Sequence, residues 1–230
     1  MPGFTPLESE AVRLSLRVAL WSVTTSLPVG LLVAWLLARR EFIGKSALNA
    51  LVHLPLVLPP VVVGYLLLVL FGREGPLGRL LFSLFGVSLP FTWQGAALAA
   101  AVMAFPLMVR AMRLSLEAVD RRLEAAARTL GARPAGVFLT IALPLMSPGI
   151  VVGAVLAFAR SLGEFGATIT FAANIPGETR IIPIALYSLI QTPGGEAAAM
   201  RLAILSVVLS LAALAASELL ARRLRARIDG

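Results

Sequence analysis

Two charged residues beside a long apolar run have the spacing needed for polar chemistry inside a membrane. Arg160 and Glu164 are four residues apart, so on a helix their side chains lie on one face. An unpaired charge near the centre of a bilayer costs about 2.5 to 3.5 kcal/mol on insertion scales, and pairing removes most of that cost. Gly163 and Gly166 flank the glutamate and leave room for a second helix. The spacing indicates an ion pair that closes a polar path or holds a structural bend.

Hydrolytic, metal and nucleotide chemistry are not indicated. Asp120 and Asp229 both lie outside the apolar stretches, so no intramembrane aspartate pair is available. The single histidine and the absence of cysteine exclude a multi-histidine or thiolate metal cluster. The sequence Gly44-Lys45-Ser46 matches the end of a phosphate-binding loop, but the first glycine of that motif falls on Arg39. We therefore expect no catalytic residues, no metal and no cofactor in this chain.

The composition is that of an integral membrane protein. Of the 230 residues, 59% are hydrophobic and 14% charged, and the mean hydropathy is +0.91, well above what a soluble domain of this length needs for its core. The formal net charge is +8, but the arginines stand beside apolar stretches and are not interleaved with aromatic residues. Nucleic acid is therefore not an expected partner, whereas membrane lipid is.

Five stretches are long and apolar enough to cross the hydrocarbon core, which takes about 20 helical residues. They are residues 18–38, 46–72, 87–109, a helix beginning near Gly149, and 202–221. The second stretch contains Pro55, Pro59 and Pro60, which predicts either a helix distorted along a pathway or a packing kink. Residues 73–86 are predicted to form an external loop with one helical turn, and 181–190 a piece too short to span.

The start of the fourth predicted helix decides where the charged pair lies. Residues 137–159 are uncharged, but Pro144 and Pro148 indicate that the membrane helix begins near Gly149. About 20 residues from there reach Thr168, so the pair would lie in the outer half of the membrane.

Basic residues predict the orientation. Thirteen of the 20 lie in segments 39–45, 110–133 and 222–227, and seven lie on the other side of the predicted spans. Because positive residues accumulate in cytoplasmic loops, we expect the N-terminus outside and the C-terminus inside.

The longest water-compatible stretch, residues 117–144, then faces the cytoplasm. Asp120 can cap a short helix, Gly131 can end it in a left-handed conformation, and Pro134 can begin a second short helix that Pro144 stops. Glu124 and Arg128 form a favourable i, i+4 pair. The first helix carries a narrow apolar stripe of mostly small residues, namely Leu123, Ala126, Ala127 and Leu130. Such a helix suits either docking on a partner or lying on anionic lipid.

The spacing of Gly131 and, nine residues later, Ile141-x-Leu143-Pro144, after an alanine cluster, resembles the EAA loop of permease subunits of bacterial ABC importers. In that family the loop forms coupling helices that enter a cleft of a cytoplasmic ATPase. The family's Glu-Ala-Ala positions fall here on Ala125, Ala126 and Ala127, so Glu124 comes one residue early and about 100° around the helix. The resemblance implies that the residues coupling the chain to the ATPase are Glu124, Ala125, Ala126, Ala127, Leu130 and Gly131.

A second block, Arg160-Ser-Leu-Gly-Glu-Phe-Gly-Ala-Thr168 with Gln191-Thr-Pro-Gly-Gly195, is similar to the oxyanion branch of these permeases, and most of all to bacterial molybdate permease subunits. The resemblance implies a homodimer in the inner membrane that binds two ATPase subunits inside, which carry ATP and Mg²⁺. Outside, a periplasmic or extracellular binding protein delivers the anion. The expected residues of the path or gate are Arg160, Gly163, Glu164, Phe165, Gly166 and Thr168.

These observations predict an all-α integral membrane protein with about five transmembrane helices and cytoplasmic coupling helices. Residues 1–230 would form one transmembrane domain, with the coupling loop at about 117–144. The expected function is that of a multi-pass permease subunit for a tetrahedral oxyanion, with molybdate preferred. Permeases for sulfate, thiosulfate or tungstate, and a membrane scaffold without transport, are the alternatives.

Overall fold

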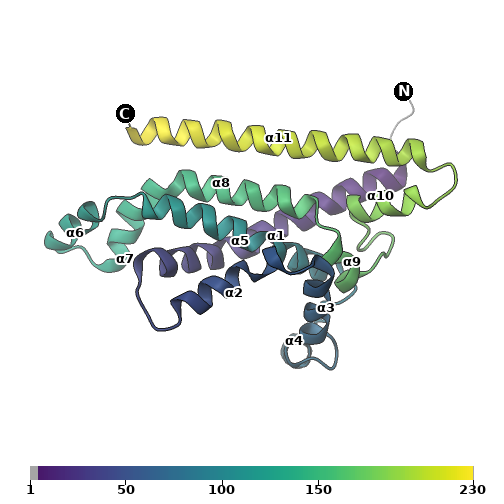
Figure 1. Cartoon of the computed structure of the whole chain (residues 1–230), viewed down its shortest axis with the longest axis horizontal. Helices are drawn as coiled ribbons and strands as arrows, with labels where there is room; N and C mark the ends of the chain where they lie inside the picture. The colour runs from purple at the N-terminus through teal and green to yellow at the C-terminus, as the bar shows by residue number, and fades with distance from the viewer. Residues whose placement is uncertain (1–4, 230) are drawn as a thin grey trace.

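The computed structural model describes residues 5–229, and every regular element in that range is helical (Figure 1). Four helical runs are long and apolar enough to cross a membrane. They are α1 (Pro6–Arg39), α5 (Trp93–Glu117), the run Pro134–Leu162, and Glu196–Leu220 within α11 (Glu196–Asp229). A bent pair, α2 (Lys45–Val57) and α3 (Pro60–Phe71), gives a fifth if it counts as one span. The expected all-α membrane fold with about five spans is confirmed.

The core is built where α1 and α8 (Leu143–Leu162) pack on α5 and against each other. Alanines cover much of α5, and Met108, Met112 and Met146 are fully buried between the helices. At Gly153 of α8 an added Cβ atom would lie 3.0 Å from the Met108 carbonyl oxygen, so the two backbones are close. Small residues allow this approach in a membrane, where packing replaces the hydrophobic effect as the force between helices.

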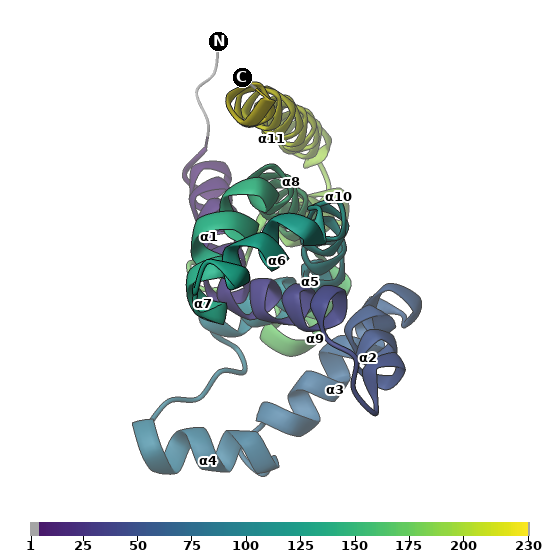
Figure 2. The same ribbon diagram turned by 90° about the vertical axis from the view of Figure 1, so that its left-hand side faces the viewer.

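The second predicted span, residues 46–72, is broken rather than gently kinked. Helices α2 and α3 meet at an angle of 118° around Leu58 and Pro59. Pro59 and Pro60 both lack an N–H group, so the hydrogen-bond ladder cannot continue through them. Helix α3 packs on α9 and leads to α4 (Pro76–Phe85), which projects from the bundle (Figure 2). Because α4 has ten residues, the prediction of a loop with one helical turn there was wrong.

The fourth membrane helix begins earlier than Gly149, and Pro144 does not stop the short helix before it. Helix α7 (Pro134–Val137) continues through a π-helical turn (Phe138–Ala142) directly into α8. The wider π-helical turn comes directly before Leu143-Pro144, where the missing N–H group of proline would interrupt a regular α-helical ladder. Pro148 is accommodated inside α8. The prediction that Pro144 stops the short helix and the prediction that the membrane helix begins near Gly149 were therefore both wrong.

The chain after α8 forms two short helices before the last long one. Helix α9 (Gly166–Ala172) and α10 (Ile182–Ile190) are too short to span, as expected for 181–190. Helix α6 (Arg121–Thr129) and α7 lie at the end of the molecule where α11 ends, and the first turns of α1 lie at the opposite end (Figure 1). The side chains of Arg225 and Arg227, which belong to the predicted basic tail, lie outside the described residues.

Candidate functional site

The first candidate site is the exposed helix α6. Asp120 is its N-cap and accepts a hydrogen bond from the Arg122 N–H group at 2.9 Å. Gly131 ends the helix with φ of +86°, and no atom lies within 4 Å of where its Cβ would be. A side chain at Gly131 would thus be opposed by backbone strain and not by a clash. The predicted cap and the predicted left-handed end are both confirmed.

The apolar stripe of α6 faces away from the bundle. Leu130 is 89% exposed and Leu123 48% exposed, and Ala126 between them is also exposed. Ala127 lines a shallow groove of about 420 Å³ together with Leu130, Ile141 and Pro144. The two halves of the motif, from the alanine cluster and from Ile141 to Pro144, therefore meet in one apolar surface. A helix with its apolar side open to water needs a partner for that side.

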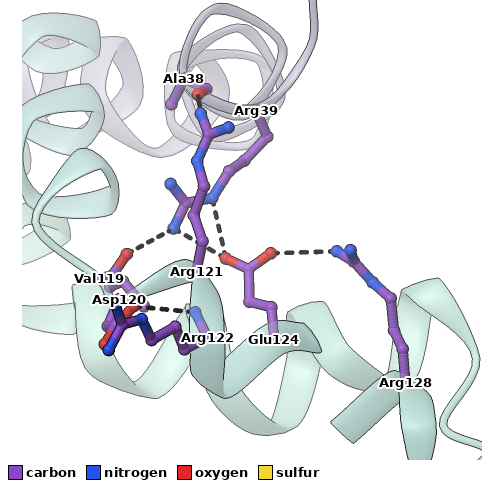
Figure 3. A network of polar contacts seen from close by, with 8 residues as sticks. All are labelled: Ala38, Arg39, Val119, Asp120, Arg121, Arg122, Glu124 and Arg128. Atoms are coloured by element: carbon purple, nitrogen blue, oxygen red, sulfur yellow. Dashed lines mark hydrogen bonds and ion pairs between the residues drawn. The ribbon is translucent and has the colours of Figure 1, made fainter. Parts of the chain in front are cut away.

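Glu124 points in the opposite direction, toward the bundle (Figure 3). Its side chain is only 9% exposed, and its Oε1 atom is 2.8 Å from the guanidinium of Arg39 at the end of α1. The Arg39 side chain is 8% exposed and also donates to the Val119 carbonyl at 3.0 Å. Oε2 of Glu124 accepts from Arg128 at 3.2 Å, which confirms the predicted i, i+4 pair. The carboxylate is therefore used within the chain and is not presented to a partner.

A second arginine strengthens the link between α6 and α1. Arg121 donates to the Ala38 carbonyl at 3.1 Å, one of the carbonyl groups left free at the end of α1 (Figure 3). The region is electropositive: a hydrogen bond from Lys45, its charge and that of Arg121 lower the pKa of Glu41. The sequence alone did not predict the contact between Arg39 and Glu124. The sequence feature that pointed to a contact within the chain was Glu124, which lies about 100° around the helix from the position of the family's glutamate.

The second candidate site is the Arg160–Glu164 pair, which the structure brings together at 2.7 Å. Glu164 does not lie on the fourth helix, because α8 ends at Leu162 and the glutamate occupies the break before α9. Its carboxylate is 1% exposed and accepts a hydrogen bond from the Ala167 N–H group at 2.9 Å, near the start of α9. Arg160 is 28% exposed. The pair thus fixes the turn between α8 and α9.

The two glycines beside the pair have different surroundings. A Cβ on Gly166 would lie 2.7 Å from Pro60, so the second helix expected at this glycine is α3 of the same chain. Gly163 is exposed. Phe165 packs against Tyr187 with ring centroids 5.2 Å apart. Thr168 is fully buried, and its hydroxyl has no hydrogen-bond partner among the described residues.

A further groove, absent from the sequence analysis, lies between α5 and α8. Its volume is about 850 Å³, and it ends beside Asp120 at the start of α6. Leucines and small residues form most of its wall, and Arg110 adds a positive charge. The residue of this wall that stands out in the sequence is Arg110, the charge that ends the third apolar stretch. Its place in a groove depends on how α8 packs, which the sequence does not give.

The family of binding-protein-dependent transport system inner membrane components matches residues 26–226. The match covers most of the chain, and the chain belongs to this family. It is therefore a multi-pass inner-membrane transport subunit, and the family is not one of enzymes.

Individual relatives refine this assignment. The molybdenum transport system permease protein ModB of Escherichia coli K12 is 63% identical over 223 residues, 97% of both chains. The sulfate transport system permease protein CysT of Salmonella typhimurium LT2 is 40% identical over 181 residues, 79% of this chain and 64% of that protein. A solved bacterial ABC transporter for import of the acidic polysaccharide alginate has a TM-score of 0.74 at 17% identity, covering 95% of this chain and 80% of that chain. That last similarity concerns the fold alone.

Proposed function

We propose that this chain is the permease subunit of an ATP-driven importer of molybdate. The observation that carries the proposal is the 63% identity to a molybdenum permease over 97% of both chains. The sulfate permease shares less sequence over a shorter range, so sulfate is the weaker candidate. In this proposal ATP hydrolysis belongs to a partner that holds ATP and Mg²⁺, because the phosphate-binding-loop pattern of this chain has Arg39 in place of its first glycine.

The proposed assembly is a homodimer with two cytoplasmic ATPases and an external binding protein. The open stripe of α6, with Leu130 89% exposed, supports an ATPase partner at that end of the molecule. The ends of α1 and α5 and the whole of α6, which carry the basic segments 39–45 and 110–133, lie at the same end (Figure 1), which supports placing that end in the cytoplasm. The C-terminus is then inside and the start of α1 outside.

The test of this function is the ATPase activity of the reconstituted complex with its binding protein, titrated with molybdate, tungstate and sulfate. Molybdate and tungstate differ little in size and charge, so we expect both to stimulate turnover, with half-stimulation by sulfate needing at least about tenfold more anion, a difference of about 1.4 kcal/mol. Preference for sulfate would reject the substrate assignment. Absence of any ATPase in the purified complex would reject transport.

We further propose that Arg160 and Glu164 belong to the outer gate. Glu164 masks the arginine in the closed state, and opening exposes positive charge to the anion. The contact at 2.7 Å and the 1% exposure of Glu164 support masking. A structural role at the turn into α9 is the competing explanation, since Glu164 also holds the Ala167 N–H group.

Glu164→Gln separates the two roles. Glutamine keeps the size of the side chain and can still accept from Ala167, but it no longer neutralises Arg160. The gate predicts an assembled complex whose anion-stimulated turnover changes by about threefold to tenfold, because a partly exposed ion pair contributes about 1 kcal/mol. A purely structural role predicts a lower yield and normal turnover per folded complex. Measuring yield and specific turnover together, with Arg180→Gln as an external control, decides between them.

A further inference from the structure

Two adjoining grooves lie where the end of α1 meets α6 and α7. The first, about 280 Å³, has four charged residues in its wall, namely Arg39, Arg40, Arg128 and Glu124. The second, about 410 Å³, is apolar and runs along α1 between Pro28 and Arg40. The walls of both include Trp35, Arg40, Pro134 and Phe138, so the grooves form one continuous depression with a basic mouth and an apolar slot.

The charges at the mouth favour an anion. Three arginines face one glutamate, and that glutamate is already paired with Arg39 and Arg128. Arg40 has no carboxylate partner among the side chains that the structure describes, and its guanidinium stands 5.1 Å from the centre of the Trp35 ring. A guanidinium that stacks on an aromatic ring keeps its N–H donors free for a phosphate.

The dimensions of the slot match half a bilayer. From Pro28 to Arg40 the helix rises about 18 Å, and half of the hydrocarbon core measures about 15 Å. Val29 and Leu32 beside the slot are 53% and 56% exposed, so this side of α1 faces either lipid or another chain. Tryptophan at the level of the basic mouth is typical of the membrane interface. A small inorganic anion would bind at the basic mouth and would leave the apolar slot unfilled.

We propose that this depression binds one anionic glycerophospholipid of the leaflet on the coupling-helix side. The phosphate lies between Arg40 and Arg128, and an acyl chain fills the slot against Leu31 and Phe138. Basic pockets between membrane helices are suited to such headgroups. Because the walls come from α1, α6 and α7, the lipid would stabilise the position of the coupling helix against the bundle. This inference does not depend on which anion is transported.

The experiment compares thermal unfolding of the purified full-length complex in detergent with added phosphatidylglycerol, phosphatidylcholine or inorganic phosphate. We expect phosphatidylglycerol to raise Tm by about 3 °C more than phosphatidylcholine, and phosphate alone to give no comparable shift. Arg40→Gln should remove most of that difference and Arg40→Lys should keep part of it. Arg223→Gln, an exposed arginine at the same end of the molecule, should keep all of it.

Four outcomes would overturn the proposal. An equal shift with phosphatidylcholine means that the slot accepts any lipid, and an equal shift with phosphate means that the mouth is an inorganic anion site. Equal losses in the Arg40 and Arg223 variants mean a general effect of surface charge. A lipid-independent change in subunit association in Arg40→Gln means that a second chain covers the depression. The wild-type lipid series and the lysine variant still decide the matter if the glutamine variant does not fold.

Discussion

Replacing Glu124 by alanine is expected to lower ATP-driven anion uptake by roughly a hundredfold while leaving membrane insertion normal. The substitution leaves the Arg39 guanidinium, whose side chain is 8% exposed, without its counter-charge. Removing one partner of a buried ion pair costs about 3 to 5 kcal/mol, because the remaining charge stays desolvated and unpaired. The least costly response is for α6 to leave the end of α1. A cost of about 3 kcal/mol lowers the population of the arrangement in which α6 can dock on its partner by about two orders of magnitude.

Two matched variants separate this explanation from a loss of surface charge. Arg128→Gln removes the exposed partner of the same glutamate, 57% exposed at its side chain, and should cost less than about 1 kcal/mol. The double change Arg39→Leu with Glu124→Leu removes both buried charges and should recover much of the lost uptake.

Hydrogen exchange of the α6 amides gives a readout independent of transport. Protection should fall in Glu124→Ala and return in the double variant. Unchanged protection and full uptake in Glu124→Ala would show that this pair does not hold the coupling helix.

The parts of the fold that could be predicted from the sequence depend on local signals. The ends of α6 follow from Asp120 and Gly131, because a cap and a left-handed glycine act on residues within one turn. The apolar spans follow from their length and lack of charge, and this is also why 181–190 was correctly judged too short. The resemblance to the coupling loop also concerns a single stretch of chain.

The missed features depend on residues far apart in sequence or on rare backbone geometry. Arg39 and Glu124 are 85 positions apart, and no periodicity connects them. The contact of Gly166 with Pro60 depends on the broken α2–α3 pair folding back onto α9. Pro144 and Pro148 predicted a late start of the fourth helix, because proline normally interrupts a helix and the π-helical turn was not anticipated.

The corrected helix start also moves the charged pair. A helix that begins at Pro134 reaches about 43 Å by Leu162, longer than the hydrocarbon core of about 30 Å. Arg160 then lies two residues before the end of the helical run, at the outer edge of its outer half. This position lowers the cost of the charge on Arg160, whose side chain is 28% exposed while that of Glu164 stays buried, as the proposed masking in the closed gate requires.

Replacing Ala126 by glutamate is expected to abolish uptake, with at least a hundredfold loss, by a route different from that of Glu124. Ala126 lies on the exposed stripe between Leu123 and Leu130, so the new carboxylate would point into the surface proposed for the ATPase. Burying an unpaired carboxylate costs several kcal/mol, and its bulk also prevents close approach of the backbones. The permease itself should remain intact, because the side chain is exposed in the isolated chain.

Ala47→Glu is the matched control, since it makes the same change at an exposed position of α2 at the same end of the molecule. Ala126→Ser keeps the small size and should retain most of the uptake.

Co-purification of the ATPase and uptake into proteoliposomes should fall together in Ala126→Glu, while α6 amide protection stays normal. In Glu124→Ala the protection itself should fall. Full ATP-dependent uptake by Ala126→Glu would mean that the stripe is not the contact surface, and the ATPase would then have to bind elsewhere on this end of the chain.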